Sequence, residues 1–163
     1  MDISKDKKIY FASDNHLGAP SNKESRIREK KFVKWLDSIK EDAEIIFLLG
    51  DLFDFWFEYK HSVPKGFTRT LGKLAELSDQ GIKIYFFVGN HDYWMNDYFK
   101  KEGFQMKYDA RNGYCVTWGL LYVHYRLLNP NVPVYILIEY LYFHINLNKL
   151  LRYARHIEKK LKI

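Results

Sequence analysis

Three short apolar runs alternate with two amphipathic stretches in the first ninety residues. The runs are Lys8 to Ala12, Ala43 to Gly50 and Ile82 to Gly89. Each is rich in β-branched and aromatic residues, which is typical of strands buried on both faces. The stretches between them repeat apolar residues at helical spacing, at Phe32, Trp35, Leu36 and Ile39 and then at Phe67, Leu71, Leu74, Ala75 and Ser78. This β-α-β-α-β order predicts an α/β fold, a parallel sheet with right-handed crossovers and helices packed on its faces.

The pattern becomes less regular after Tyr98. The stretch "GFQMKYDARNGYCVTWGLLYVHY" predicts short strands around turns at Asn112-Gly113 and Trp118-Gly119, so that one or two hairpins extend the sheet. After "NPNVP" the pattern becomes helical. The last predicted helix has an apolar face that consists of Leu147, Leu150, Leu151, Ala154, Ile157 and Leu161. We expect one domain over residues 1–163, with a core at 8–125 and a helical part at 129–163.

The positive charge of the chain is concentrated at its C-terminal end. The net charge is +6, and the last fifteen residues hold six Lys or Arg against one Glu, so they carry +5 and the remainder only +1. We therefore expect no nucleic-acid partner. Two interpretations of the basic stretch stay open: a solvated helix face, or a helix that rests on anionic lipid or phosphate.

Cysteine content and hydropathy favour the cytoplasm. Cys115 is the only cysteine, so neither an intrachain disulfide nor a thiolate metal cluster can form, which is typical of a reducing compartment. The N-terminal stretch "MDISKDKKIYF" has no apolar signal core. The most apolar later run contains Glu139 and His144 and falls short of the ~20 residues of a membrane-spanning helix.

Polar clusters follow each of the three predicted strands. Ligands bind at the carboxyl ends of strands in sheets of this type. Each cluster alone would fit a turn cap or an Asx turn, but their recurrence at three strand ends predicts a shared metal site. Carboxylate, amide and imidazole groups suit manganese, iron or zinc, and a carboxylate can bridge two ions. The clusters are Asp14 and His16, then Asp51 and Asp54 in "GDLFD", then Asn90, His91 and Asp92 in "GNHD".

These motifs, D-x-H, G-D-x-x-D and G-N-H-D, resemble in order and spacing the signature of the calcineurin-like metallophosphoesterases. The stretches "SDNHLGAP", "GDLFDFWFEY" and "GNHDYW" are most similar to the branch of UDP-2,3-diacylglucosamine hydrolases of lipid A biosynthesis. The resemblance covers residues 8 to about 125. It implies a metallophosphoesterase-like layered α/β sandwich, two divalent ions, expected to be Mn²⁺, and cleavage of UDP-2,3-diacylglucosamine to UMP and an acylated sugar 1-phosphate.

The resemblance also assigns roles residue by residue. Asp14 and His16 would hold the first ion, Asp51 would bridge both, and Asn90 would hold the second. His91 matches the phosphate-contacting histidine of the family and is the predicted catalytic residue, so that Asn90 and His91 bind substrate. Asp54 and Asp92 are expected to orient the histidines.

The match weakens after residue 120. The family's next motif is a strand ending in H-G-D, and "LLYVHYRLL" offers His124 at a predicted strand end with Tyr125 and Arg126 in place of Gly and Asp. His124 is a predicted ligand of the second ion, and a histidine without metal is its alternative. The closing G-H-x-H motif does not occur, so we expect the fold to be incomplete at its C-terminal end. His144 and His156 are not expected to replace it.

Three functions stay open on the sequence alone. The first is a hydrolase of an acylated nucleotide sugar, peripheral on the inner face of the inner membrane, and the basic end motivates the contact with anionic lipid. The second is a phosphoesterase with a soluble substrate, and the third is a non-catalytic remnant of the family. The aromatic residues near the second motif could line a ligand channel or belong to the core; they are Phe53, Phe55, Trp56, Phe57 and Tyr59.

Overall fold

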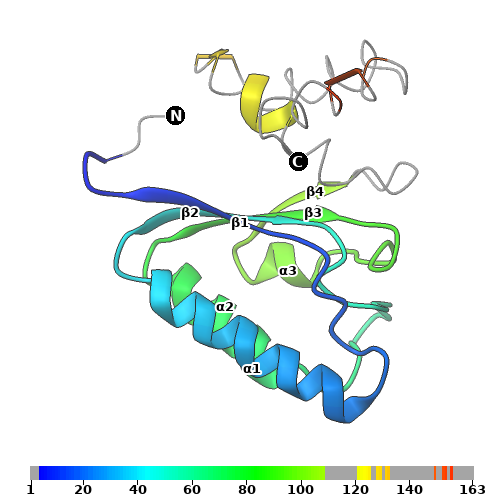
Figure 1. Cartoon of the computed structure of the whole chain (residues 1–163). Coiled ribbons are helices and arrows are strands. Elements are labelled where there is room, and N and C mark those ends of the chain that lie inside the picture. The colour runs from blue at the N-terminus through cyan, green and yellow to red at the C-terminus, as the bar shows by residue number, and fades with distance from the viewer. Residues whose placement is uncertain are drawn as a thin grey trace. The chain divides into compact units, whose positions relative to one another are not determined.

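Four parallel strands form the sheet of this protein in the order β1-β2-β3-β4 (Figure 1). They are β1 (Lys8–Ala12), β2 (Ala43–Leu49), β3 (Lys83–Val88) and β4 (Gln105–Tyr108). The computed structural model describes residues 4–108, 121–125, 128–129, 131–132, 149, 152–153 and 155. The chain divides into two compact units, Ile3–Cys115 and Met1–Asp2 with Val116–Ile163. All the elements named in this subsection belong to the first unit, and the single domain stays a prediction.

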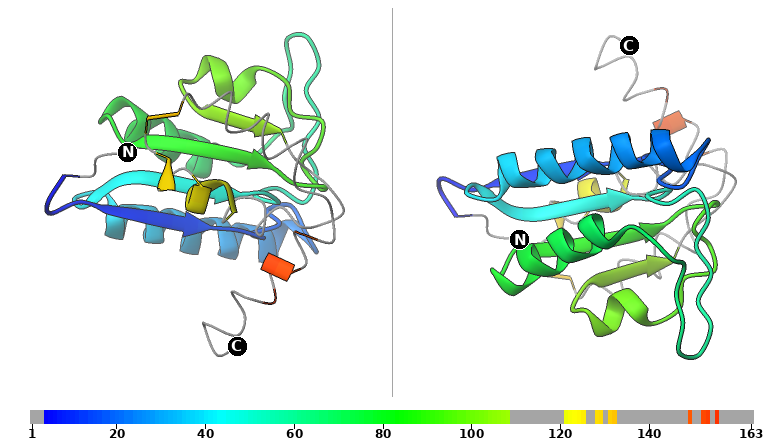
Figure 2. Two further views of the ribbon diagram at one scale, coloured as in Figure 1. Left: turned by 90° about the horizontal axis from the view of Figure 1, so that it is seen from above. Right: turned by 90° about the horizontal axis from the view of Figure 1, so that it is seen from below.

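The helices α1 (Asn22–Ile39), α2 (Thr68–Asp79) and α3 (Tyr98–Lys101) lie on one face of the sheet (Figures 1 and 2). The Ser21 hydroxyl caps the start of α1: it accepts from the amide of Glu24 and donates to the Glu24 carboxylate. The β-α-β-α-β prediction is confirmed, with each strand boundary within one residue of its expected place. These three helices all lie on one face of the sheet, whereas the sequence predicted helices on its faces.

One expectation about the later part of the chain is confirmed and one is wrong. The sheet is extended after β3, because α3 returns the chain and β4 pairs with β3 in parallel, whereas the hairpins expected after β4 stay a prediction. Residues 121–125 are helical and not a strand. A short apolar run has no periodicity that separates the two states, so the local sequence could not decide. The turns predicted at Asn112-Gly113 and Trp118-Gly119 lie outside the described residues.

Alternation along the strands gives the sheet two different faces. On β2, Ile46 and Leu48 belong to the core shared with the helices, in which Leu36 and Leu74 are fully buried. On the other face, Phe47 stacks between Phe11 and Tyr85, its direct partners on the neighbouring strands, with ring centroids 5.3 and 5.0 Å apart. Direct partners of this kind keep the three strands in register, so their carboxyl ends fall at one edge.

A cluster of aromatic rings joins α3 to the rest of the core. Phe99 is buried, and its ring lies 5.0 Å from those of Trp56 and Phe86, between the loop after β2 and the strand β3. Its ring also contacts Phe53 and Phe104. Packing of this single side chain therefore holds a four-residue helix that could not form alone.

Replacing Phe99 with Ala tests this role. We expect Phe99→Ala to lower the free energy of unfolding by about 3–5 kcal/mol, because it removes a buried ring and leaves a cavity. Urea unfolding followed by circular dichroism measures the change. The matched control is Ile27→Ala on α1, where the side chain is half exposed and little change is expected. Equal effects of the two substitutions would contradict the packing described.

Candidate metal centre

The loops after β1 and β2 run side by side beyond the end of the sheet. The amide of Asp14 donates to the carbonyl of Gly50 at 3.2 Å, and that of His16 donates to the carbonyl of Asp51 at 3.0 Å. Two further bonds tie Leu17 to Leu52 and Asp54 to Leu17, both at 2.9 Å. The parallel pairing of the strands thus continues into the loops, and this places the first two polar clusters against each other.

The backbone at these clusters is in a rarely occupied conformation. Asp14, His16 and Asp51 have φ values of 53°, 42° and 53°, in the left-handed region that favours glycine. Gly50, which precedes Asp51, has φ of 87°. Each such residue costs about 1–3 kcal/mol, and backbones of this kind cluster at functional sites, where surrounding bonds hold them. The inter-loop hydrogen bonds supply that restraint here.

Asp51 connects the third loop to the other two. Its side chain is buried, and Oδ1 accepts a hydrogen bond from the amide of His91 at 2.9 Å. Gly89, just after β3, lies directly against it: a Cβ at position 89 would be 2.6 Å from the amide nitrogen of Asp51 and 2.7 Å from its Cγ. Residue 89 must therefore lack a side chain for Asp51 to occupy its place.

Two overlapping groups of side chains have the spacing of metal ligands. One consists of Asp14, His16 and Asp51, the other of His16, Asp54 and His91, and within each the nearest ligand atoms lie within 4.8 Å of one another. Nε2 of His16 faces Oδ1 of Asp14 at 3.9 Å. Carboxylate oxygen and imidazole nitrogen are donors that suit manganese, iron or zinc, so the residues present fit a divalent cation.

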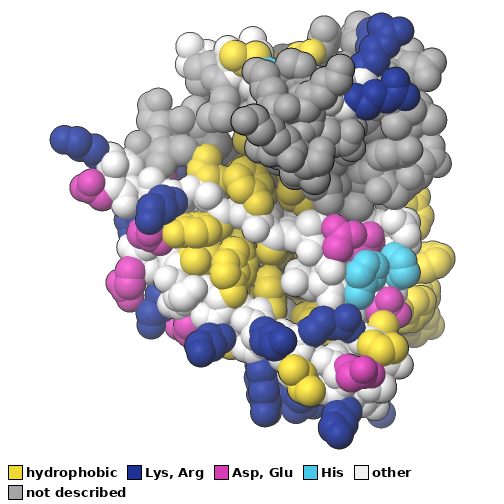
Figure 3. Space-filling model, viewed as in Figure 1, with side chains coloured by type: hydrophobic (Ala, Val, Ile, Leu, Met, Phe, Trp, Pro, Cys, Tyr) yellow, Lys and Arg dark blue, Asp and Glu magenta, His cyan; other side chains and the backbone are white. Residues whose placement is uncertain are grey.

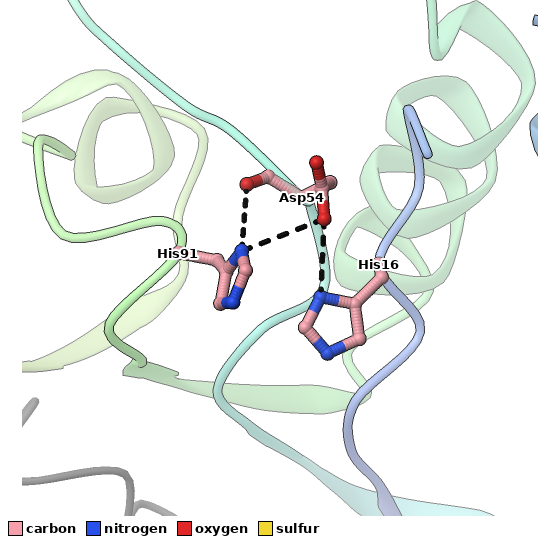
Figure 4. Close-up of side chains that lie close together, drawn as sticks. All are labelled: His16, Asp54 and His91. Atoms are coloured by element: carbon pink, nitrogen blue, oxygen red, sulfur yellow. Dashed lines mark hydrogen bonds and ion pairs between the residues drawn. The ribbon is translucent and has the colours of Figure 1, made fainter. Parts of the chain in front are cut away.

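Asp54 lies between the two imidazole rings (Figure 4). Its Oδ1 is 3.5 Å from Nδ1 of His16 and 3.4 Å from Nδ1 of His91. Nδ1 of His91 is also 3.0 Å from the backbone carbonyl of Asp54, which can only accept, so this nitrogen carries the proton and donates. Nε2 of each ring is thereby left for a metal or a substrate. The expected orienting role agrees with this position of Asp54.

Asp92 has a different role from the expected one. Its carboxylate does not orient a histidine ring but accepts from two backbone amides, that of Leu52 at 3.0 Å and that of Gly89 at 2.7 Å. The side chain is fully buried, and this burial raises the pKa of the carboxyl group to about 6. The two hydrogen bonds to Asp92 therefore join the end of β3 to the loop after β2.

Two further side chains are predicted ligands whose place in the site stays a prediction. Asn90 precedes His91 and is exposed at the same edge of the sheet. His124 belongs to the second compact unit, where its ring packs against those of Tyr125 and Tyr153 at 6.0 and 5.7 Å. Its expected strand is helical, and its role as a ligand stays a prediction. His144 and His156 lie outside the described residues.

Arg28 supports the site and was not foreseen. From α1 its Nη2 donates to the carbonyl of His16 at 3.0 Å and also to that of Ala19. A polar residue on an amphipathic helix is ordinarily solvated, so the sequence carries no signal for this contact. Gly89 was equally missed as a steric requirement, because the glycine that ends a strand is usually read as a turn residue.

The aromatic residues near the second motif divide between the core and the surface, and a ligand channel lined by the exposed ones stays a prediction. Phe53 and Trp56 are fully buried in the core, whereas Phe55, Phe57 and Tyr59 are 57%, 47% and 68% exposed. Neither alternative left open by the sequence therefore describes the whole stretch.

The chain is similar in sequence to known phosphoesterases. The family model of the calcineurin-like phosphoesterases matches residues 7–161. The chain is 53% identical over 95 residues to a UDP-2,3-diacylglucosamine hydrolase of Porphyromonas gingivalis, covering 58% of this chain and 36% of that protein. For the protein of that name from Haemophilus influenzae (strain KW20) the identity is 35% over 97 residues, covering 59% and 38%. The chain thus spans 36–38% of the length of these curated relatives.

A solved structure also shows some likeness. The crystal structure of Pseudomonas putida nuclease MPE aligns with a TM-score of 0.40 and 21% sequence identity, covering 61% of this chain and 46% of that one.

A pair of glycine substitutions tests the contact at Asp51. We expect Gly89→Ala to displace Asp51, to destabilise the fold and to weaken Mn²⁺ binding at least about tenfold, because the added carbon meets backbone. Calorimetric titration and thermal unfolding measure the two effects. The matched control is Gly72→Ala in α2, where open space surrounds the position and a gain of about 0.5–1 kcal/mol is expected. Unchanged Mn²⁺ affinity in Gly89→Ala would contradict the arrangement.

Asp92→Asn tests the buried carboxylate. We expect a loss of about 1–3 kcal/mol in the free energy of unfolding. In the unchanged protein each carboxylate oxygen accepts from a backbone amide, whereas Asn would turn its NH₂ group toward one of these donors and leave that donor without an acceptor. Chemical unfolding measures it. Asp6→Asn, at an exposed position, is the control and should unfold like the unchanged protein. A stabilised Asp92→Asn would mean that desolvation of the charge outweighs its hydrogen bonds.

Proposed function

The chain belongs to the calcineurin-like phosphoesterase family, and from this premise we propose that it is a metal-dependent hydrolase of a phosphoester or pyrophosphate bond. The family uses divalent metal ions. The observation that carries the proposal is the convergence of three strand-end loops, which brings Asp14, His16, Asp51, Asp54 and His91 into two overlapping groups of ligand spacing. A polar cluster at one strand end could be turn chemistry, but three loops with matched oxygen and nitrogen donors favour a cation site.

We propose that Asp14, His16 and Asp51 would hold the first ion and that Asp51 and Asn90 would hold the second, for which the resemblance in sequence also implies His124. Asp51 is suited to a bridging place because it is buried where the three loops meet. When bound, the ions, which we expect to be Mn²⁺, supply Lewis-acid polarisation and neutralise charge on the phosphoryl oxygens. Asp54 orients His16 through its Nδ1 and leaves Nε2 for coordination.

His91 is the proposed catalytic residue. Because its Nδ1 donates to the carbonyl of Asp54, Nε2 is the atom that meets substrate. In the imidazolium form Nε2 also carries a proton, which it can donate to a phosphoryl oxygen or to the leaving group. The side chain is 42% exposed, so a substrate can reach it without any movement of the loops.

The proposed substrate is UDP-2,3-diacylglucosamine, cleaved to UMP and the acylated sugar 1-phosphate. The names of the relatives at 53% and 35% identity support it, as do the stretches around the three motifs. Within the described residues no helix is both long and apolar enough to cross a bilayer. We place the protein in the cytoplasm, peripheral on the inner face of the inner membrane, where an acylated substrate would be within its reach.

A soluble phosphoester is the second candidate, favoured by how open the site is. Side chains of Asp14, His16 and His91 are 54%, 29% and 42% exposed, which would admit a small substrate with no lipid. Detergent-dispersed UDP-2,3-diacylglucosamine and bis(p-nitrophenyl) phosphate separate the two candidates. Hydrolysis of only the latter would exclude the lipid substrate.

Metal removal and one substitution test the chemistry. We expect hydrolysis to disappear on chelation, to return with Mn²⁺, and to fall at least about 100-fold in Asp51→Asn, because the amide cannot bridge two ions as a carboxylate does. The matched control is Asp79→Asn at the exposed end of α2, which should keep full activity. A folded protein that hydrolyses neither substrate with any divalent ion would instead be the non-catalytic remnant.

A further inference from the structure

Exposed apolar side chains gather on two neighbouring loops. Among the described residues, eight large hydrophobic side chains are exposed, and five of them lie in the loops after β2 and β3. Figure 3 shows hydrophobic side chains directly beside the histidines at one edge of the molecule. Apolar patches of this kind on a water-soluble surface usually mark a binding surface. We call the five residues the aromatic patch; they are Phe55, Phe57, Tyr59, Tyr93 and Trp94.

The aromatic patch is a firm surface built on the core. Phe57 and Trp94 pair as a parallel bridge, the amide of Glu58 donates to the carbonyl of Trp94 at 3.2 Å, and the rings of Phe55 and Trp94 are 5.9 Å apart. Phe53 and Trp56, which alternate with the exposed rings, are fully buried. The inward rings therefore anchor the loop while the outward rings stay in solvent.

The loop after β2 projects beyond the sheet and ends in a tight turn (Figure 2). Tyr59 and Ser62 exchange two backbone hydrogen bonds of 3.0 Å, which puts Lys60 and His61 at the tip of that turn. A projecting turn of this shape can reach a flat surface that the sheet itself cannot touch.

The uncompensated charge on the projecting part of this loop, away from the metal centre, is positive. The Glu58 carboxylate points inward and accepts from Nε1 of Trp56 at 3.1 Å and from the amides of Asp97 and Tyr98 at 2.9 and 3.2 Å. Asp97 is paired with Lys101 at 2.8 Å. Lys60 and Lys65 are exposed, and neither forms an ion pair with a carboxylate of the described residues. This part of the loop, with these two lysines, is therefore complementary to an anionic surface.

We propose that the aromatic patch docks this protein on an anionic lipid bilayer, with its rings at the headgroup level and Lys60 and Lys65 on the lipid phosphates. Tyr and Trp favour this interface because each has an apolar ring and a polar group. Asp54 precedes Phe55 and His91 lies two residues before Tyr93, so docking presents the metal centre to the membrane surface. The inference rests on the proposed function for its purpose, since it brings the site to a lipid substrate.

Vesicle binding by the 163-residue chain, without metal or substrate, tests the inference. The protein is sedimented with phosphatidylcholine vesicles that contain or lack phosphatidylglycerol. We expect binding to the anionic vesicles with a blue shift in the emission of Trp94, assigned by its loss in Trp94→Phe. The affinity of the double variant Phe55→Ser, Phe57→Ser for the anionic vesicles should be at least about tenfold lower. The variant Lys60→Gln, Lys65→Gln should lose the preference for anionic over neutral vesicles.

Control variants separate docking by the aromatic patch from binding by another part of the chain. Ile27→Ser removes an equally exposed apolar side chain on α1 and should bind as the unchanged protein does, and thermal unfolding checks that every variant is folded. Full binding by the double variant, with loss in Lys159→Gln, Lys160→Gln, Lys162→Gln, would overturn the inference in favour of the basic C-terminal stretch. The inference would also be overturned if the double variant bound vesicles normally and lost only hydrolysis of the lipid substrate. It would be overturned too if the double substitution changed only the oligomeric state, from dimer to monomer, as measured by size-exclusion chromatography.

Failure of this inference is distinguishable from failure of the proposed function. Sedimentation reports the surface alone, whereas metal-dependent hydrolysis of bis(p-nitrophenyl) phosphate reports the site alone. A chain that hydrolyses the soluble ester but ignores anionic vesicles keeps its proposed chemistry and loses the docking surface.

Discussion

The place of Asp51 is the constraint on which the rest of the site depends. Its carbonyl accepts from His16, its carboxylate accepts from His91, and its backbone leaves no room for a side chain at Gly89. One residue in a left-handed conformation thus fixes three loops relative to one another. Because the three strands are parallel and in register, these loops leave the sheet at the same edge. The contacts of Asp51 then hold the loops together, so that their polar side chains form one cluster.

Stability and chemistry are balanced at this edge of the sheet. Left-handed backbone at three residues and the buried carboxyl group of Asp92 are each unfavourable by themselves. Hydrogen bonds between loops, and the backbone donors around Asp92, offset them. The aromatic core beneath, centred on Phe99, supplies the packing that keeps the loops from relaxing. The site is therefore held by neighbours that take no part in its chemistry.

Much of the first unit could be predicted because its signals are local. Continuous apolar runs predicted β1, β2 and β3, and helical spacing predicted α1 and α2, since burial on two faces or on one leaves a pattern in the chain. The parallel pairing of β4 could not be predicted, because it depends on the return through α3 and on Phe99 finding its place in the core. The helical state of residues 121–125 could not be predicted either, as a short apolar run fits a strand or a helix.

For the candidate site, the sequence by itself determined which chemical groups stand at the strand ends: carboxylates, an amide and imidazoles in three ordered motifs. Only the tertiary structure decided how they are used. It set Asp54 between two imidazoles and turned Asp92 away from them onto backbone amides. It also divided one aromatic stretch between core and surface. The physical reason is that residue type fixes what a group can bind, whereas the contacts between loops far apart in the chain fix where it points.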